Sequence, residues 1–417
     1  MSNYLIKLIP TGKFFFGGDM TFSVGAKERP KNWNSKPEEE KERIRQQIDD
    51  NTRYSSYIIK SEKFPQQTSL LGMLRFLLLR NDSSLFDGYK IIGEVKDLIG
   101  EKSFTSNGGN RNNYGKIQDL SPCFLMNGDN IITRLPMDYG LETIDLSAGN
   151  LLSYNNNPIN LSKIVSGKKD NGDEIKYSAK DGLSIRYGYV SKKENGEDIV
   201  TIYDDSEIFI EDQRIGISRN IATGKTEDNA LYKQVSYRLA DDFCFAFYAK
   251  INIDDIKPFN NQVVLLGADS SQFVIQIKEE EIRDISLPET NVSVKGSFCK
   301  VVLTSPTLID KETAKIADFA ITETIPFKCM QTMQTSTETT KKTDNYDRVK
   351  GGIAYSERYE LYQTGSVFYF STSDRFESFQ KHFIDKENKE NPRAGKDADF
   401  HQIGYNHFQV IDLTTNK

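Results

Sequence analysis

The chain has 417 residues, of which 37% are hydrophobic and 27% charged, and its formal net charge is -6. This composition excludes an intrinsically disordered chain, and the length predicts two domains because single cores rarely grow beyond about 300 residues. The negative net charge argues against a protein that coats nucleic acid without sequence preference, but it allows a local basic groove.

Cysteine and histidine spacing predicts neither a disulfide framework nor a metal site. The four cysteines lie far apart without a CxxC pair, and His382, His401 and His407 lack the i, i+4 spacing of a helical metal site. We therefore expect free thiols, no metal and no cofactor. No secretory signal precedes Tyr4, and the longest nearly apolar run, 70–79, is too short for the roughly 20 residues of a membrane span. The sequence predicts a cytoplasmic protein without membrane contact.

The chain opens with a predicted buried strand, Tyr4 to Ile9, that ends at Pro10. A turn rich in glycine and aromatic residues follows. Residues 27–53 then change to dense mixed charge, and we interpret them as an insertion that carries an exposed helix with i, i+4 ion pairs.

The stretch 64–80 predicts the principal helix. Thr68 or Ser69 is the expected N-cap, and apolar residues on all sides predict a helix that is buried around most of its circumference. Gly72 suggests that another backbone passes close by, and Arg75 needs a partner or a phosphate. Two interpretations follow: a core helix with a snorkelling arginine, or a helix start that binds an anion with Arg75 behind it.

Most of the remaining sequence predicts strands. Asn127-Gly128 indicates a hairpin, residues from about 150 to 200 form a polar insertion, and 214–218 and 231–239 bracket a polar loop. Strand patterns recur after residue 241, at the ranges 243–251, 263–266, 273–278, 301–304, 367–370 and 408–413.

This pattern predicts an α+β fold with antiparallel sheets, glycine-rich loops and insertions. We expect two ferredoxin-like units, of the type that also builds RNA-recognition modules. The boundary is placed near residue 240. Residues 1–240 then form an N-terminal domain with insertions at 27–53 and about 150–200, and residues 241–417 form a C-terminal domain with a glycine-rich loop.

Signals for catalysis are incomplete. Residues 222–226 end like a phosphate-binding loop, but Arg219 stands where its first glycine is required, which excludes that NTPase motif. Gly17-Gly18-Asp19 resembles a polymerase turn, but Met20 stands where a second acid would help, which favours a structural turn. The acidic doublets 204–205 and 254–255 are more typical of solvated loops than of cation sites.

Several glycine-bearing or polar loops carry cations and hydroxyl groups that suit phosphate oxygens, while nearby aromatic rings could stack on bases. They are the segments Arg214 to Arg219, Arg348 to Gly352, and Gly365-Ser366. Each loop alone is also compatible with an ordinary turn. Together they favour RNA binding.

Four stretches in this order resemble the RAMP superfamily of type III CRISPR effector complexes, and most resemble the third subunit of the Cmr (type III-B) complex. The stretches are Leu8 to Gly18, Pro65 to Arg75, Arg214 to Ile217 followed by Ala230-Leu231-Tyr232, and Gly365 to Phe370. The charged insertion and the polar region near 150–200 depart from the family pattern.

The resemblance implies two ferredoxin-like domains, no catalytic activity, and a place in a ribonucleoprotein used in antiviral defence. Its expected partners are the 5′ handle of the guide RNA (crRNA), the large polymerase-like subunit and the first backbone RAMP subunit, with target RNA contacted indirectly. With the loops above, it predicts these RNA-binding residues: Ser69, Arg75, Arg111, Arg214, Gly216, Ser218, Arg219, Lys341, Lys342, Arg348, Gly351, Gly352, Gly365 and Ser366.

Two other functions stay open at this stage. The first is a RAMP-type endoribonuclease that processes precursor guide RNA, with chemistry at one of the three histidines. The second is a protein-only scaffold, because an acidic partner surface and a phosphate call for the same cation.

Overall fold

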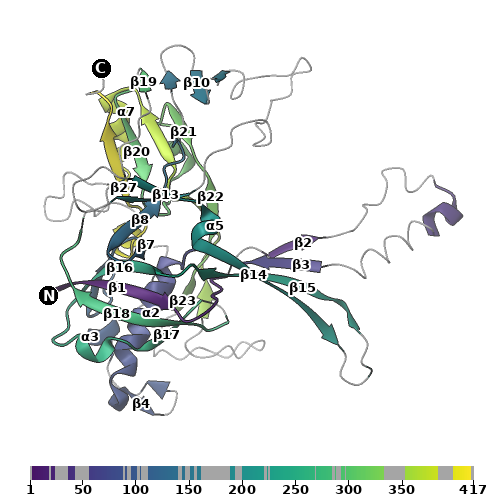
Figure 1. Ribbon diagram of the computed structural model, residues 1–417, viewed down its shortest axis with the longest axis vertical. Helices are drawn as coiled ribbons and strands as arrows, with labels where there is room; N and C mark the ends of the chain where they lie inside the picture. The colour runs from purple at the N-terminus through teal and green to yellow at the C-terminus, as the bar shows by residue number, and fades with distance from the viewer. Residues whose placement is uncertain are drawn as a thin grey trace, which may run out of the picture.

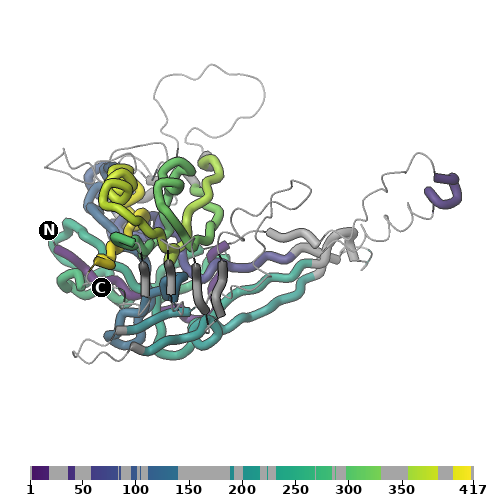
Figure 2. The backbone as a smooth tube through the Cα atoms, turned by 90° about the horizontal axis from the view of Figure 1, so that it is seen from above, coloured from purple at the N-terminus to yellow at the C-terminus, as the bar shows by residue number. Residues whose placement is uncertain are grey.

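The computed structural model (Figures 1 and 2) describes residues 2–17, 20–23, 36–42, 56–87, 90–91, 95–100, 104, 111–139, 143–145, 151–154, 157–160, 188–192, 200–219, 223, 226–267, 269–283, 287, 293–295, 297–332, 353–383 and 398–414.

A nine-stranded sheet forms the lower part of the molecule in Figure 1. Its strand β1 (Ser2–Pro10) pairs antiparallel with β16 (Phe243–Ile251) on one side and β18 (Ser271–Glu279) on the other. The central position explains why consecutive residues of β1 are buried instead of alternate ones. The other strands are β13 (Val200–Tyr203), β12 (Tyr189–Lys192), β8 (Asn130–Arg134), β7 (Phe124–Asn127), β17 (Val263–Leu266) and β6 (Ile117–Leu120).

The predicted hairpin and strands are confirmed. Strands β7 and β8 pair through Asn127 and Asn130, with Gly128 at a φ of 60°, as the asparagine-glycine pair indicated. The turn after β1 is structural where it is described, because Phe14 is 1% exposed and its ring lies 5.3 Å from that of Phe245. Gly18 and Asp19 lie outside the described residues.

The predicted helix is α2 (Gln67–Arg80), and it packs its leucines against β1 and the strands beside it. Its N-cap is Gln66, which makes no side-chain capping bond, so the prediction of Thr68 or Ser69 as N-cap was wrong. The helix begins earlier because Pro65 already ends the extended segment, and the backbone N–H of Ser69 donates to Gln66 O at 2.9 Å inside the first turn.

Most sides of α2 are buried, as predicted, but one face is open. Gly72 is exposed, and Phe76, one turn later, is 56% exposed. A Cβ built on Gly72 meets no atom within 4 Å, so close approach of another backbone of this chain does not explain the glycine.

A four-stranded antiparallel sheet forms the upper part of the molecule in Figure 1. Its strands lie in the order β21 (Phe319–Ile321), β26 (Val367–Phe370), β20 (Cys299–Leu303) and β27 (Phe408–Asp412). Two helices belong to this unit, α6 (Lys311–Ala314) after β20 and α7 (Ser373–Gln380) after β26. Phe379 of α7 packs against Phe368 and Phe370, which gives the sheet its own core.

An arm projects from the body (Figures 1 and 2). It consists of β14 (Phe209–Arg219), β15 (Thr226–Leu239), β3 (Ser56–Lys60) and β2 (Met20–Ser23), in that order. The charged insertion contains the predicted helix at 38–42, with ion pairs from Lys36 to Glu40 and from Lys41 to Glu38.

The remaining elements are short. They are η2 (Ser83–Leu85), β4 (Phe86–Asp87), β5 (Lys90–Ile91), α3 (Lys96–Ile99), β9 (Thr143–Asp145), β10 (Leu151–Tyr154), β11 (Asn157–Asn160), α5 (Asp205–Ile208), η4 (Lys257–Phe259), β19 (Ser293–Lys295), β22 (Thr324–Phe327), β23 (Met330–Thr332), β24 (Ile353–Tyr355), β25 (Tyr359–Tyr362) and α8 (Ala398–Gln402).

Strand pairing does not change at residue 240. Strands β16, β17 and β18, which follow that position, belong to the same sheet as β1, and β20 is the first strand of the upper sheet. Similarly, β12 lies in the region expected to be an insertion but pairs with β8 in the large sheet.

Candidate nucleic-acid interface

The residues Arg214 to Arg219 lie in a long β-ribbon and not in a turn. Strand β14 runs through Arg219, and Arg214 and Gly216 stand opposite Gln234 and Tyr232 of β15. A Cβ on Gly216 would lie 2.1 Å from Cζ of Tyr232, so the tyrosine ring covers the glycine. The glycine is therefore explained by close packing within the arm, and the prediction of a glycine-bearing loop is corrected because the segment belongs to a strand. Ser218 occupies the same strand.

Ser69 and Arg75 lie on α2, where Arg75 has a partner within the chain. Its Nε donates to Ile99 O at 2.9 Å, at the end of α3, and burial lowers the pKa of its guanidinium from the ordinary value. The expectation that this charge needs a partner is confirmed. The partner is a backbone carbonyl, so Arg75 ties α3 to α2.

The predicted anion site at the start of α2 is filled by the chain itself. Tyr405 is buried, which raises the pKa of its phenol, and its neighbour Gly404 packs against the Gln67 side chain at the N-terminus of the helix. Gln67 Nε2 donates to Ser121 O at 2.7 Å on the same side. The segment around Gly404 therefore already occupies the space beside Gln67.

Gly365 and Ser366 lie inside the protein. Ser366 is 0% exposed, its hydroxyl lies 3.8 Å from Met137 Sδ, and Gly365 O accepts the Met137 N–H at 2.8 Å. Gly365 has a φ of 90°, and a Cβ there would approach Leu135 O within 2.7 Å. This loop joins the segment after β8 to the upper sheet. Lys341, Lys342, Arg348, Gly351 and Gly352 lie outside the described residues.

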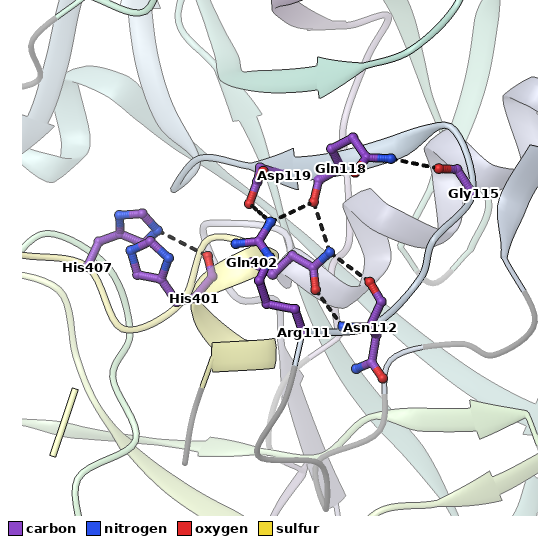
Figure 3. Close-up of polar contacts among 8 residues, drawn as sticks. All are labelled: Arg111, Asn112, Gly115, Gln118, Asp119, His401, Gln402 and His407. Carbon is purple, nitrogen blue, oxygen red and sulfur yellow. Dashed lines mark hydrogen bonds and ion pairs between the residues drawn. The ribbon is translucent and has the colours of Figure 1, made fainter. Parts of the chain in front are cut away.

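Arg111 lies beside β6 and Gln402 of α8 (Figure 3). Its guanidinium forms an ion pair with Asp119 and donates to Gln118 O at 3.3 Å. Beside it, Gln402 of α8 donates to the backbone oxygens of Asn112 and Gln118, each at 2.9 Å, while the Asn112 N–H donates back to the Gln402 side chain. The C-terminal segment is therefore held on β6 by a network of amide hydrogen bonds.

A cleft of about 1500 Å³ opens between the nine-stranded sheet and the C-terminal unit. One side of the cleft is formed by the start of α2, β6, β16 and the base of the arm. The other side is formed by residues within the segments 303–306, 323–327, 361–364 and 401–409. Its charged and histidine side chains are Lys60, Glu62, Lys63, Asp119, Arg134, Asp205, Lys250, Arg283, Glu323, His401 and His407. None of the predicted RNA-binding residues that the structure describes lines this cleft.

Most cleft cations already face a carboxylate. Lys60 lies 2.8 Å from Glu211, Arg134 lies 3.7 Å from Glu323, and Lys63 pairs with Asp205. The hydrogen bond from Lys60 lowers the pKa of Glu211, and the same bond raises the pKa of Lys60, so this pair is charged at neutral pH. Because these pairs are partly exposed, their mutual attraction is weak and a phosphate can compete for the cations.

Lys250 differs from the other cleft cations. It lies on β16 between Asn3 of β1 and Asp119 of β6, it is exposed, and it forms no ion pair with any described acidic residue. Asp119 is engaged by Arg111. Lys250 is therefore the cleft cation best placed to meet an incoming phosphate. Its sequence context, a lysine near the end of a buried strand, gave no local signal of this position.

The histidines do not form a metal centre in the described part of the chain. The rings of His401 and His407 stack at 3.9 Å between centroids, and His382 lies 3.4 Å from Asp310. No group of three or more His, Cys, Asp or Glu side chains is placed to hold a metal ion within the ranges given above. The four cysteines are free, as expected, and burial raises the pKa of Cys244 to about 11, which keeps that thiol protonated. None of the helices described is long and apolar enough to span a membrane.

Comparison with known proteins gives a family match over most of the chain. The model of the CRISPR-associated protein family Cas_Cmr3 matches residues 54–413. No match was found among curated proteins. A chain of the cryo-EM structure of the type III-B Cmr-beta bound to cognate target RNA and AMPPnP is 14% identical, with a TM-score of 0.44 and 99% of each chain covered.

Two further structures are similar to the chain. One is the same type III-B Cmr-beta bound to cognate target RNA, with 14% identity, a TM-score of 0.45, and 98% of this chain and 96% of that chain covered. The other is the Csm3-Csm4 subcomplex of the type III-A interference complex, with 12% identity, a TM-score of 0.31, and 88% and 92% covered. The family model alone spans well over half of the sequence and confirms the resemblance seen there: the chain belongs to the Cas_Cmr3 family of CRISPR-associated proteins.

Proposed function

We propose that this protein is the non-catalytic subunit of a type III-B effector that anchors the 5′ handle of the guide RNA. It also docks the large polymerase-like subunit and the first backbone RAMP subunit, and meets target RNA only through them. The observation that carries the RNA assignment is the cleft, in which Lys250 forms no ion pair with a described acidic residue and Lys60, Lys63 and Arg134 pair with exposed or partly exposed carboxylates.

The strand orders support two ferredoxin-like units as the framework of this function. In the C-terminal unit, the order β27-β20-β26-β21 places the fourth, first, third and second strands side by side, with α6 and α7 as the two crossovers. In the N-terminal unit, β18-β1-β16-β7 repeats that order with α2 as the first crossover and η4 in place of the second helix. We propose that the boundary lies between β18 and β20.

The proposed RNA interface combines the cleft with the arm. Phosphates contact Lys250 and the neighbouring cleft lysines, and Arg214 and Arg219 on the arm extend the contact. Arg111 is close to the cleft through Asp119 and is a secondary contact. Ser69, Arg75, Gly365 and Ser366 are left out because the structure gives them internal partners or buries them. RNA contact by residues 341–352 stays a prediction.

The test is binding of the purified chain, alone and with its large partner subunit, to a labelled guide RNA across a salt series. The same RNA without its handle is the comparison. Handle-dependent binding without cleavage is expected. For Lys250→Gln we expect the log-log salt slope to become shallower by about 0.7, the value of one phosphate contact on a single strand. Lys315→Gln, an exposed lysine on the C-terminal unit, is the matched control.

Equal binding of both RNAs would contradict handle anchoring. Cleavage of repeat RNA, with or without divalent metal, would instead establish the endoribonuclease. No RNA binding under any salt condition, together with intact partner binding, would establish the protein-only scaffold.

A further inference from the structure

Strand β17 is an edge strand of the large sheet as far as the structure describes it. It is the last strand in the sheet order, and β18 is the one described strand that pairs with it. The Ile275 N–H donates to Gln262 O just before the ladder, so the next opposed pair, Val263 and Val274, is a non-hydrogen-bonded pair. By the same alternation, the N–H and C=O groups of Val263 and Leu265 point away from β18.

The side chains beside this edge are apolar and exposed. Val263 is 43% exposed, Leu265 is 55% exposed, and Phe76 of α2 is 56% exposed above the same edge. A small hollow of about 50 Å³ lies between the helix and the strand and is lined by Met73, Phe76, Leu77, Arg80, Val264 and Leu265. Apolar side chains thus lie on both faces of the open strand.

Arg80 lies along the edge. Arg80 Nη1 donates to Val263 O at 3.2 Å, which supports the outward direction of that carbonyl, and Nη2 donates to Gln262 Oε1 at 2.8 Å. The hollow itself has no acidic lining residue. A segment that pairs with this edge would therefore gain from an acidic residue opposite Arg80.

We propose that the β17 edge accepts a short extended segment from another protein subunit, which adds a strand to the nine-stranded sheet. The backbone groups of Leu265 supply the pairing, Phe76 and Leu265 contact alternate apolar side chains of the segment, and Arg80 meets an acidic residue in it. Unpaired edge groups call for an extended backbone, and the apolar surroundings call for protein instead of RNA. This inference goes beyond RNA anchoring and does not depend on the cleft.

The test is residue-resolved amide hydrogen exchange of the chain, free and assembled with the other protein subunits of its effector. We expect the Leu265 amide to exchange at least tenfold more slowly in the assembly, while Val264 is unchanged because β18 already protects it. In co-purification, Leu265→Lys should lower recovery of one protein partner at least tenfold. Val410→Lys, on the edge strand β27 with 41% exposure, is the control and should leave recovery unchanged.

The outcomes separate this inference from the proposed function. An assembly in which Leu265 exchanges as fast as in the free chain overturns strand addition and leaves RNA anchoring intact. Protection in the free chain that grows with its concentration identifies a second copy and overturns the heterologous partner. Failure of the wild-type chain to recover any protein subunit overturns both strand addition and membership of the complex.

Discussion

At the scale of single residues, a buried ion pair with a buried tyrosine beside it lies between the two sheets. Lys300 of β20 lies 2.6 Å from Asp138, and the Tyr369 hydroxyl donates to the same carboxylate oxygen at 2.5 Å. All three side chains are nearly or fully buried, and burial raises the pKa of Tyr369, so its phenol stays protonated as a donor. Asp138 follows β8, so the pair links the lower sheet to the upper one.

Substituting one member of the Asp138–Lys300 pair should therefore destabilise the protein far more than substituting both. We expect Asp138→Asn to lower the free energy of unfolding by about 3 to 5 kcal/mol, because it leaves the Lys300 ammonium buried without its counter-charge. The double substitution Asp138→Leu with Lys300→Met should recover most of that loss. Urea denaturation of the three proteins measures both effects. A loss below about 1 kcal/mol in the single variant would show that water reaches Lys300.

At the scale of elements, the local sequence pattern was enough to predict most strands and α2. It was not enough to predict what these elements pack against. The alternation in β18 and the proline before α2 are local signals, and both elements form where expected. The glycine in Arg214 to Arg219 indicated a turn because its actual reason, the Tyr232 ring on the opposite strand, is sixteen positions away. A glycine can indicate that another group packs closely against the backbone, but the sequence alone does not identify that group.

The arm carries a prediction of its own. Arg214 is exposed on β14, and Arg219 ends that strand beyond a register shift. If both contact phosphates of the guide, replacing both with Gln should weaken handle binding and reduce the log-log salt slope by about 1.4. Fluorescence anisotropy across a salt series measures the slope, with Lys315→Gln as the control. An unchanged slope would remove the arm from the RNA interface.

At the scale of the whole molecule, the sequence could not show which strands share a sheet. Strands β16 and β18 return to β1 across more than 200 residues, so the boundary predicted near residue 240 from local composition separates β1 from the strands that pair with it. The cleft was missed for the same reason. Lys60, Lys250 and His407 come from distant segments, and no local pattern marks a side chain that faces a cavity formed by long-range pairing.

The relative position of the two units depends on a few tight contacts, and Gly404 is the clearest. Its φ is 95°, and a Cβ there would lie 1.8 Å from Gln67 Nε2 and 2.4 Å from Ser121 O. Gly404→Ala must therefore push the C-terminal segment away from the start of α2 and break the Gln67 to Ser121 hydrogen bond. The left-handed backbone adds strain of about 1 to 3 kcal/mol.

We expect Gly404→Ala to lower the free energy of unfolding by about 2 to 4 kcal/mol, as the sum of that strain and one lost buried hydrogen bond. Gly72→Ala is the matched control, because its helical site is open, and it should stabilise the protein by about 0.5 to 1 kcal/mol. Thermal and urea denaturation measure both. Since Gly404 lines the cleft while Gly72 does not, handle binding should fall only in the Gly404 variant. If that variant is destabilised but binds RNA normally, the cleft does not hold the handle.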